Sequence, residues 1–167
     1  MQTPSVNVIE FQPVPKVPGR DVSSLGLVFD TIIDGQSYLE TLTAFEETQP
    51  DSWAKPCIAG LGTAEVMHTL DQHGARIHPF VCDLWDNWDD WDYNCLIEIY
   101  NQQVVCWRSW KYYDMTTSRE STSDYTKLPV LTFEYKQYMD AVAQARDLIR
   151  KDGSTLHMKN RFWWQYD

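Results

Sequence analysis

The chain has 167 residues, of which 43% are hydrophobic. This is enough for one folded domain with a substantial core, and it excludes disorder along the whole length. The formal net charge of −10 argues against binding to nucleic acid or anionic membranes and favours basic partners. No apolar run reaches the roughly 20 residues of a membrane helix, and the N-terminus lacks the features of a signal peptide, so we expect a cytoplasmic protein.

Residues 1–20 are predicted to form an extended, proline-rich arm. Proline fixes φ and lacks a backbone donor, and this stretch contains Pro4, Pro13, Pro15 and Pro18. Ile9 and Phe11 supply apolar side chains that favour docking of the arm on the rest of the chain. Residues 21–167 are predicted to form a single domain.

A strand and a capped helix are predicted next. Leu25–Ile33 is rich in β-forming residues, and Asp34 and Gly35 are typical of the turn that ends such a strand. Ser37 can cap the following helix, with Glu40 as its partner three residues later. We expect this helix to end before Pro50.

The middle of the chain is predicted to be mainly β-structure. A short helix over Thr63–His73 precedes a strand over Ala75–Cys82, in which Pro79 favours an edge position or a bulge. Two apolar, β-branched runs, Cys95–Tyr100 and Val104–Trp110, are separated by three polar residues and together predict a hairpin.

The last part of the domain is predicted to contain one strand and one long helix. A polar loop over Tyr112–Lys127 precedes a strand over Val130–Tyr135. A helix over Tyr135–Lys151 follows, and Gly153 lies just past its end. Its apolar face consists of Tyr138, Val142, Ala145, Leu148 and Ile149. The expected fold class is α+β, mainly an antiparallel sheet with helices packed on one face.

The most informative segment is Asp83–Asp92, which we call the Trp/Asp segment. It reads Asp-Leu-Trp-Asp-Asn-Trp-Asp-Asp-Trp-Asp, with no basic residue to balance the charge. Tryptophan is enriched among interface hot spots, and clustered aspartates attract basic partners and raise association rates. The candidate partner-binding residues are Trp85, Asp86, Trp88, Asp89, Asp90 and Trp91.

Two other interpretations of the Trp/Asp segment stay open. Its tryptophans could cover the domain's own core. Its aspartates could form a calcium loop, although such a loop needs a central glycine and a final glutamate, and glycine is absent from Asp83–Asp92.

Metal and catalytic motifs are weak in this sequence. The cysteines (Cys57, Cys82, Cys95 and Cys106) contain no C-x-x-C pair and are expected to be reduced, buried thiols. The histidines are His68, His73, His78 and His157, and zinc could be held only by poorly spaced pairs such as His78 with Cys82 or His68 with His73. G-x-S-x-G, P-loop and G-x-G-x-x-G motifs are missing. We therefore expect no cofactor, no metal and no catalytic residue.

A second aromatic cluster contains Trp107, Trp110, Tyr112 and Tyr113, with Arg108 and Lys111 between them. Strand alternation predicts Trp107 and Ser109 on one face and Arg108 and Trp110 on the other. Exposed aromatics beside arginine can bind nucleic acid, but the net charge of −10 favours packing in the core or on the sheet.

The chain resembles a group of small, uncharacterised bacterial proteins. The residues that carry the resemblance are Phe29–Leu39, Phe80-Val81-Cys82, Cys95, Val105-Cys106-Trp107-Arg108, and Leu131-Thr132-Phe133 leading to Tyr138. Members of the group often carry a cysteine cluster between the two central strands, where this chain has the Trp/Asp segment with Cys82 and Cys95 at its edges. Their size and style are similar to those of the immunity proteins that accompany bacterial toxins.

The sequence thus predicts a non-enzymatic, acidic protein-binding module. It would be an immunity or inhibitor protein that neutralises a basic protein, such as a toxin, through the Trp/Asp segment. One alternative is a mimic of nucleic-acid charge that blocks a DNA- or RNA-binding protein. Another is a metal- or thiol-dependent enzyme.

Overall fold

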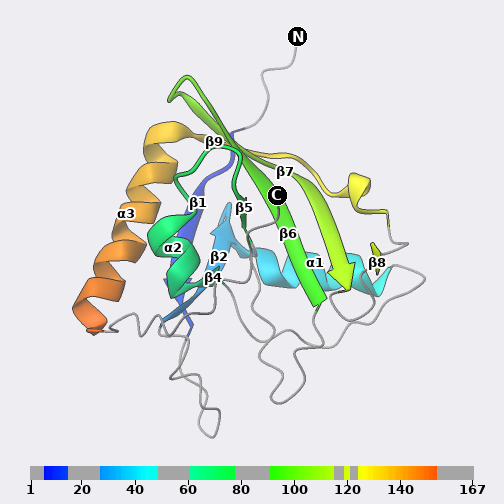
Figure 1. Cartoon of the computed structure of the whole chain (residues 1–167), viewed down its shortest axis with the longest axis horizontal. Helices are drawn as coiled ribbons and strands as arrows, with labels where there is room; N and C mark the ends of the chain where they lie inside the picture. The colour runs from blue at the N-terminus through cyan, green and yellow to red at the C-terminus, as the bar shows by residue number, and fades with distance from the viewer. Residues whose placement is uncertain are drawn as a thin grey trace, which may run out of the picture.

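The computed structural model of the chain describes residues 6–14, 27–48, 61–77, 91–114, 119–120 and 124–153. Within these residues the fold is α+β, as predicted, and it contains two antiparallel sheets and three α-helices (Figure 1). The helices are α1 (Tyr38–Glu47), α2 (Thr63–His68) and α3 (Tyr135–Asp152), with a 3₁₀ turn η1 (Tyr125–Lys127). None of the described helices has the length and apolar character needed to cross a membrane.

The smaller sheet is built around β2. It contains β1 (Ile9–Pro13), β2 (Val28–Ile33), β3 (Gln36–Ser37) and β4 (Leu61–Gly62), and the other three strands all pair with β2. The predicted turn joins β2 to β3, with positive φ values of 52° at Asp34 and 81° at Gly35. Ser37 then caps α1, because its hydroxyl accepts the backbone N–H of Glu40 at 3.4 Å.

The larger sheet is dominated by the predicted hairpin. It contains β5 (Arg76–Ile77), β6 (Trp91–Tyr100), β7 (Val104–Asp114), β8 (Arg119–Glu120) and β9 (Leu131–Glu134), in the order β5-β6-β7-β8 with β9 also paired to β7. The hairpin turn contains positive φ values at Asn101 and Gln102. Both hairpin strands extend beyond the predicted runs, so part of the predicted polar loop over Tyr112–Lys127 is in fact β7, β8 and η1.

The N-terminal arm joins the two sheets. Its backbone at Asn7 donates to the carbonyl of Thr132 at 2.7 Å, and the Asn7 side chain accepts the Thr132 N–H at 3.1 Å. The next residue, Val8, donates its N–H to the Asp34 carboxylate at 2.7 Å. Ile9 and Phe11 are buried in the common core, so the apolar side chains of the arm dock as the sequence predicts.

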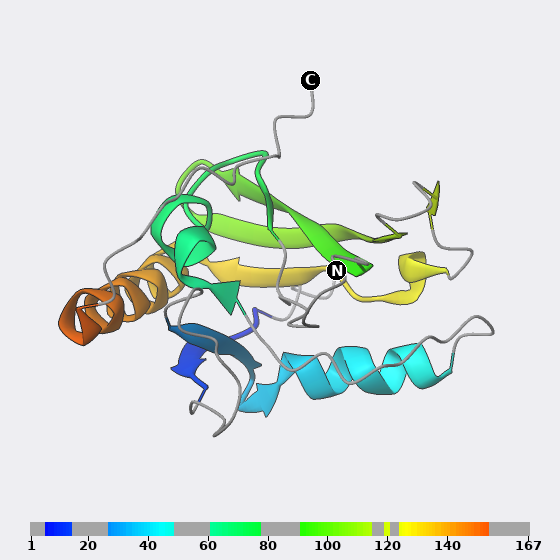
Figure 2. The same cartoon turned by 60° about the horizontal axis from the view of Figure 1, so that its bottom comes forward.

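The core lies between the two sheets and centres on Trp107. The smaller sheet, α1 and α3 all lie on one side of the larger sheet (Figure 2). Inward-facing side chains of both sheets meet there, including the fully buried Phe29, Trp107 and Phe133. Helices α1 and α3 therefore lie on one face of the larger sheet, and its other face is not covered by any described element (Figure 2).

The long helix α3 is close to its prediction, with one error on its apolar face. Gly153 ends it in the left-handed conformation with φ 66°. Leu148, predicted to be inward, is 39% exposed, whereas Ala141 is buried. The helix predicted over Thr63–His73 is shorter in the structure, because its α-helical part ends at His68 and turns follow.

Candidate functional site

The Trp/Asp segment lies mostly outside the described residues. Trp85, Asp86, Trp88, Asp89 and Asp90 belong to that undescribed part. Trp91 is the first residue of β6, and its backbone is paired with that of Asp114 on β7. Asp92 is paired in the same way with Tyr113. The segment therefore ends inside the hairpin ladder, and it continues without a break into the longest strand pair of the described residues.

A bulge follows a few residues along the hairpin. Asn94 pairs with Lys111 and Leu96 with Arg108, so β7 has one extra residue between these pairs. Ser109 takes up the extra residue with a φ of 55°, the left-handed conformation of the first residue in a G1-type bulge. The guanidinium of Arg76 donates to the Asn94 side chain at 2.6 Å and to the Ser109 carbonyl at 3.5 Å.

This bulge overturns the predicted faces of the second aromatic cluster. Strict alternation would put Trp107 and Trp110 on opposite faces, but both are buried, with exposed fractions of 0% and 6%. Their rings lie 6.5 Å apart edge to face. Arg108 is left exposed on the outer face. The prediction that this cluster serves core packing is therefore confirmed for the two tryptophans.

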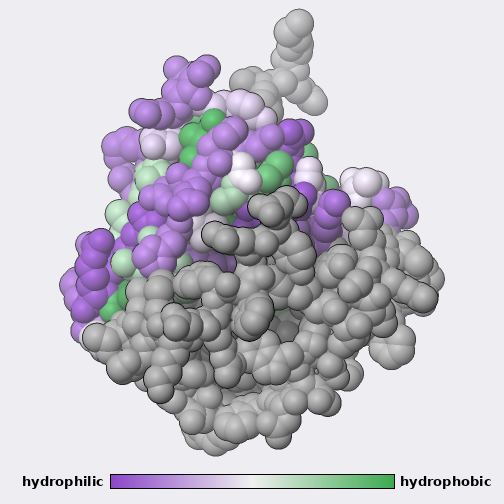
Figure 3. All heavy atoms as spheres, in the orientation of Figure 1, coloured by the Kyte–Doolittle hydropathy of each residue, from purple (hydrophilic) through white to green (hydrophobic). Residues whose placement is uncertain are grey.

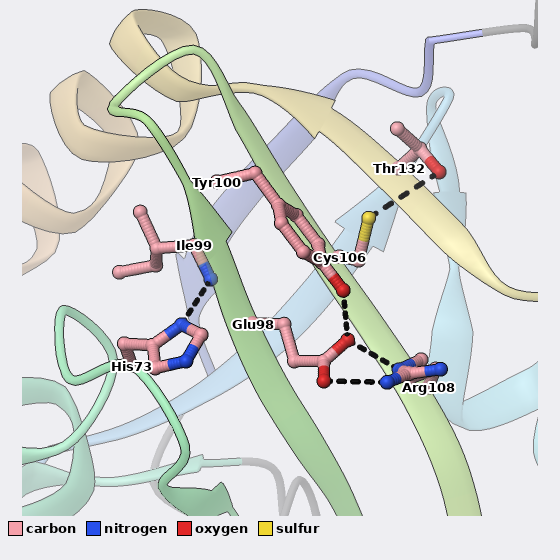
Figure 4. A network of polar contacts seen from close by, with 7 residues as sticks. All are labelled: His73, Glu98, Ile99, Tyr100, Cys106, Arg108 and Thr132. Atoms are coloured by element: carbon pink, nitrogen blue, oxygen red, sulfur yellow. Dashed lines mark hydrogen bonds and ion pairs between the residues drawn. The ribbon is translucent and has the colours of Figure 1, made fainter.

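The outer face of the hairpin carries a polar cluster of Glu98, Tyr100 and Arg108, which we call the Glu98 cluster (Figure 4). Arg108 donates from Nη2 to Glu98 Oε1 at 2.5 Å, and its Nε forms an ion pair with the other carboxylate oxygen. The Tyr100 hydroxyl donates to the same carboxylate at 2.5 Å. The Glu98 side chain is only 14% exposed, whereas that of Arg108 is 45% exposed.

The Glu98 cluster holds its groups in fixed protonation states. Hydrogen bonds from Arg108 and then Tyr100 keep the pKa of Glu98 below its ordinary value. The Glu98 carboxylate in turn raises the pKa of the Tyr100 hydroxyl. A general acid or base works best with a pKa near the working pH, so these shifts move both groups away from proton transfer. The arrangement suits a rigid, charged surface.

The Glu98 cluster is not among the sites that the sequence predicts. A usable signal was present, because Glu98 and Tyr100 are two residues apart on one strand and therefore share a face. Placing Arg108 beside them required the hairpin register, which pairs Glu98 with Cys106. Figure 3 shows this side of the molecule, where the described residues are mostly hydrophilic with a few hydrophobic ones between them.

The described thiols differ in their surroundings. Cys95 is fully buried, and burial raises its pKa well above the ordinary value, so it stays a protonated thiol and a poor nucleophile. Cys106 is half-buried, and its sulfur lies 3.9 Å from the Thr132 hydroxyl. Cys57 and Cys82 lie outside the described residues. The prediction of a buried cysteine thus holds fully for Cys95 and partly for Cys106.

The two described histidines differ in their surroundings. His73 uses Nδ1 to accept the backbone N–H of Ile99 at 2.9 Å. His68 is exposed at the end of α2, while His78 and His157 lie outside the described residues. In the part of the chain that the structure describes, no three His, Cys, Asp or Glu side chains gather as metal ligands.

We compared the chain with family models, with curated proteins and with solved structures, and none of these comparisons gave a match. The resemblance to the immunity-like bacterial group therefore remains a prediction.

Proposed function

We propose that the protein is a non-enzymatic binding module of the cytoplasm that holds a basic protein partner through the Trp/Asp segment. In its most specific form the proposal is that it acts as an immunity or inhibitor protein. It would cover the working surface of a basic partner, such as a toxin, with an acidic and aromatic surface.

The observation that carries this proposal is the attachment of the Trp/Asp segment to the hairpin. Its last two residues, Trp91 and Asp92, already pair with Asp114 and Tyr113. Recognition residues commonly lie on connections that a rigid scaffold positions. An attachment point that is already ordered also reduces the entropy lost when a partner binds.

The chemistry of the segment selects a basic partner. The segment contains five aspartates, counting Asp83 and Asp92 at its ends, and no cationic residue. They therefore attract lysine and arginine over a distance of about 8–10 Å at physiological salt. The three tryptophans add large apolar area and can receive cations on their faces, at about 0.5–2 kcal/mol each. The fixed ion pair of the Glu98 cluster further along the same hairpin supports a binding role more than a catalytic one.

The test is a quantitative pull-down from source-cell lysate with four forms of the full chain. These are wild type, Trp85→Ala/Trp88→Ala, Asp86→Asn/Asp89→Asn, and the control Glu10→Gln/Glu47→Gln. The two charge variants each remove two negative charges, but the control removes them from exposed positions on β1 and α1. We expect wild type and the control to retain a basic protein that both segment variants lose. Equal capture by all four forms would contradict the proposal.

The same experiment separates a mimic of nucleic-acid charge from an inhibitor of another basic protein. Duplex DNA added to the wild-type complex should displace a partner that normally binds nucleic acid, because both ligands then compete for one cationic surface. A partner of another kind should stay bound at equal ionic strength.

A further inference from the structure

The edge of β6 that faces away from β7 is paired with a turn segment and with one imidazole. The segment 73–77 runs antiparallel to β6, and β5 itself contributes the pairs Arg76 with Leu96 and Ile77 with Cys95. Two more backbone bonds extend the ladder, from Gly74 N–H to the Ile97 carbonyl and from Ile97 N–H to the Ala75 carbonyl, both at 2.8 Å. The ladder then runs out of backbone acceptors.

The side chain of His73 supplies the next acceptor. Ile99 points its N–H to the same side as Ile97, away from β7, and donates it to His73 Nδ1 at 2.9 Å (Figure 4). A nitrogen that accepts a hydrogen bond carries no proton, so any proton of the neutral ring must be on Nε2. The imidazole therefore extends the ladder by one bond only while it is neutral.

We propose that His73 is an acid-sensitive latch on the edge of β6, closed when the ring is neutral and opened when it is protonated. Protonation turns Nδ1 from an acceptor into a donor, and a donor facing the Ile99 N–H repels it. The ring must then turn away, and the backbone N–H of Ile99 is left unpaired at a sheet edge. Such a group is the point at which an extended chain can add to a sheet.

The charged groups around the ring favour this movement. Glu98, the neighbour of Ile99 on β6, interacts electrostatically with His73, which contributes to the lowered pKa of the Glu98 carboxyl. An imidazolium released from Ile99 therefore has an anion close by. The opposing charge is Arg108 on β7, which is engaged in its ion pair with Glu98. On the turn that carries His73, Asp71 is paired with Arg146 of α3.

The test measures amide hydrogen exchange at Ile99 by NMR on the full ¹⁵N-labelled chain between about pH 8 and about pH 5, the range in which histidine changes charge. Rates are expressed as protection relative to the intrinsic rate at each pH. We expect protection at Ile99 to fall at least about fivefold on acidification, as for the loss of one hydrogen bond. Ile97, whose N–H donates to a backbone carbonyl, should keep its protection.

The variant His73→Asn supplies the control, because its amide oxygen can accept a hydrogen bond but does not titrate. In this variant the exchange protection of the Ile99 amide, whatever its level, should not depend on pH. The imidazole nitrogens give a second readout in the wild type, where Nδ1 should be unprotonated at neutral pH. An equal loss of protection in His73→Asn, unchanged protection at Ile99 in the wild type, or a neutral ring protonated on Nδ1 would overturn the latch.

Discussion

The Tyr138 hydroxyl connects two buried groups, the indole N–H of Trp107 and the backbone carbonyl of Leu70. It accepts the indole N–H of Trp107 at 3.2 Å and donates to the Leu70 carbonyl at 2.8 Å. All three residues are fully buried. Burial raises the pKa of the hydroxyl, so it keeps its proton and can always act as the donor to Leu70.

Replacing Tyr138 with phenylalanine should therefore be costly. Tyr138→Phe keeps the ring but leaves the Trp107 N–H and the Leu70 carbonyl without a hydrogen-bond partner. Each unpaired buried group should lower the free energy of unfolding by about 1–3 kcal/mol. Urea unfolding followed by fluorescence measures the change in the free energy of unfolding. Tyr100→Phe is the matched control, because that residue is exposed on the outer face and its hydroxyl donates to Glu98. A similar loss of stability in both variants would show that the buried hydrogen bonds of Tyr138 contribute no more than the exposed one of Tyr100.

The Asp71–Arg146 pair links the turn after α2 to α3 and predicts an acid-dependent stability. The Arg146 guanidinium donates to the Asp71 carboxylate at 2.9 Å, and this hydrogen bond holds the pKa of Asp71 below its ordinary value of 3.8. A lowered folded-state pKa means that the stabilisation is present above 3.8 and is lost as the pH falls through the lowered value.

We expect Asp71→Asn to be less stable than wild type at neutral pH by a few tenths to about 1 kcal/mol, since the pair is partly exposed. The difference should shrink towards zero as acid protonates Asp71. Thermal unfolding at a series of pH values measures it, and Asp147→Asn, which removes an exposed pair with Arg150 on one helix, provides the comparison. A difference that stays constant down to the lowest pH would rule out the carboxylate as its source.

At the scale of elements, β1 is held by a side chain of α3 as well as by β2. The Gln137 amide donates to the Ile9 carbonyl at 2.6 Å and accepts the Ile9 N–H at 3.3 Å. This amide takes the place of a neighbouring strand and closes the outer edge of β1 at this residue. The N-terminal arm is thus fixed to the helix as well as to the sheets.

Gln137→Ala should loosen β1 selectively. It leaves both backbone groups of Ile9 without their partner, and we expect a loss of about 1–3 kcal/mol in the free energy of unfolding, with faster amide exchange from Ile9 to Gln12. Gln144→Ala is the matched control, because Gln144 is an exposed glutamine of the same helix. If both variants exchange alike in β1, the amide is not what holds the strand.

The elements that the sequence predicts best are those with local signals. The helix α3 has a clear apolar period and a terminal Gly153, and the hairpin has two β-branched runs around a polar turn. Ser37 and Glu40 mark the start of α1 because capping depends on residues three apart. These features need no knowledge of the rest of the fold.

The errors arise where distant or irregular contacts decide the structure. Ser109 gives no sign of the bulge it occupies, since glycine is the usual residue at positive φ. The predicted faces of Trp107 and Trp110 are wrong for this reason. The bond between Asn7 and Thr132 joins residues from opposite ends of the chain, which periodicity cannot reveal. At the candidate site, composition identifies the Trp/Asp segment, but the Glu98 cluster depends on strand register.

At the scale of the whole molecule, the described elements cover one face of the larger sheet and leave its other face uncovered. The smaller sheet, α1 and α3 lie against one face of the larger sheet (Figure 2), and the buried aromatic core lies between them. The hairpin belongs to both sides, because its inner face builds the core and its outer face carries the Glu98 cluster. The Trp/Asp segment enters this hairpin at Trp91, so a contact made there is connected directly to the most extensive strand pair of the described fold.

The most direct test of the proposed function is photo-crosslinking in source cells from position 88. A benzophenone amino acid replaces Trp88 in the full chain, and in a second form it replaces Gln144 on the exposed side of α3. We expect position 88 to give a covalent adduct with one basic protein and position 144 to give none. No adduct from position 88, an adduct only with acidic proteins, or the same adducts from both positions would contradict a partner-binding role for the Trp/Asp segment.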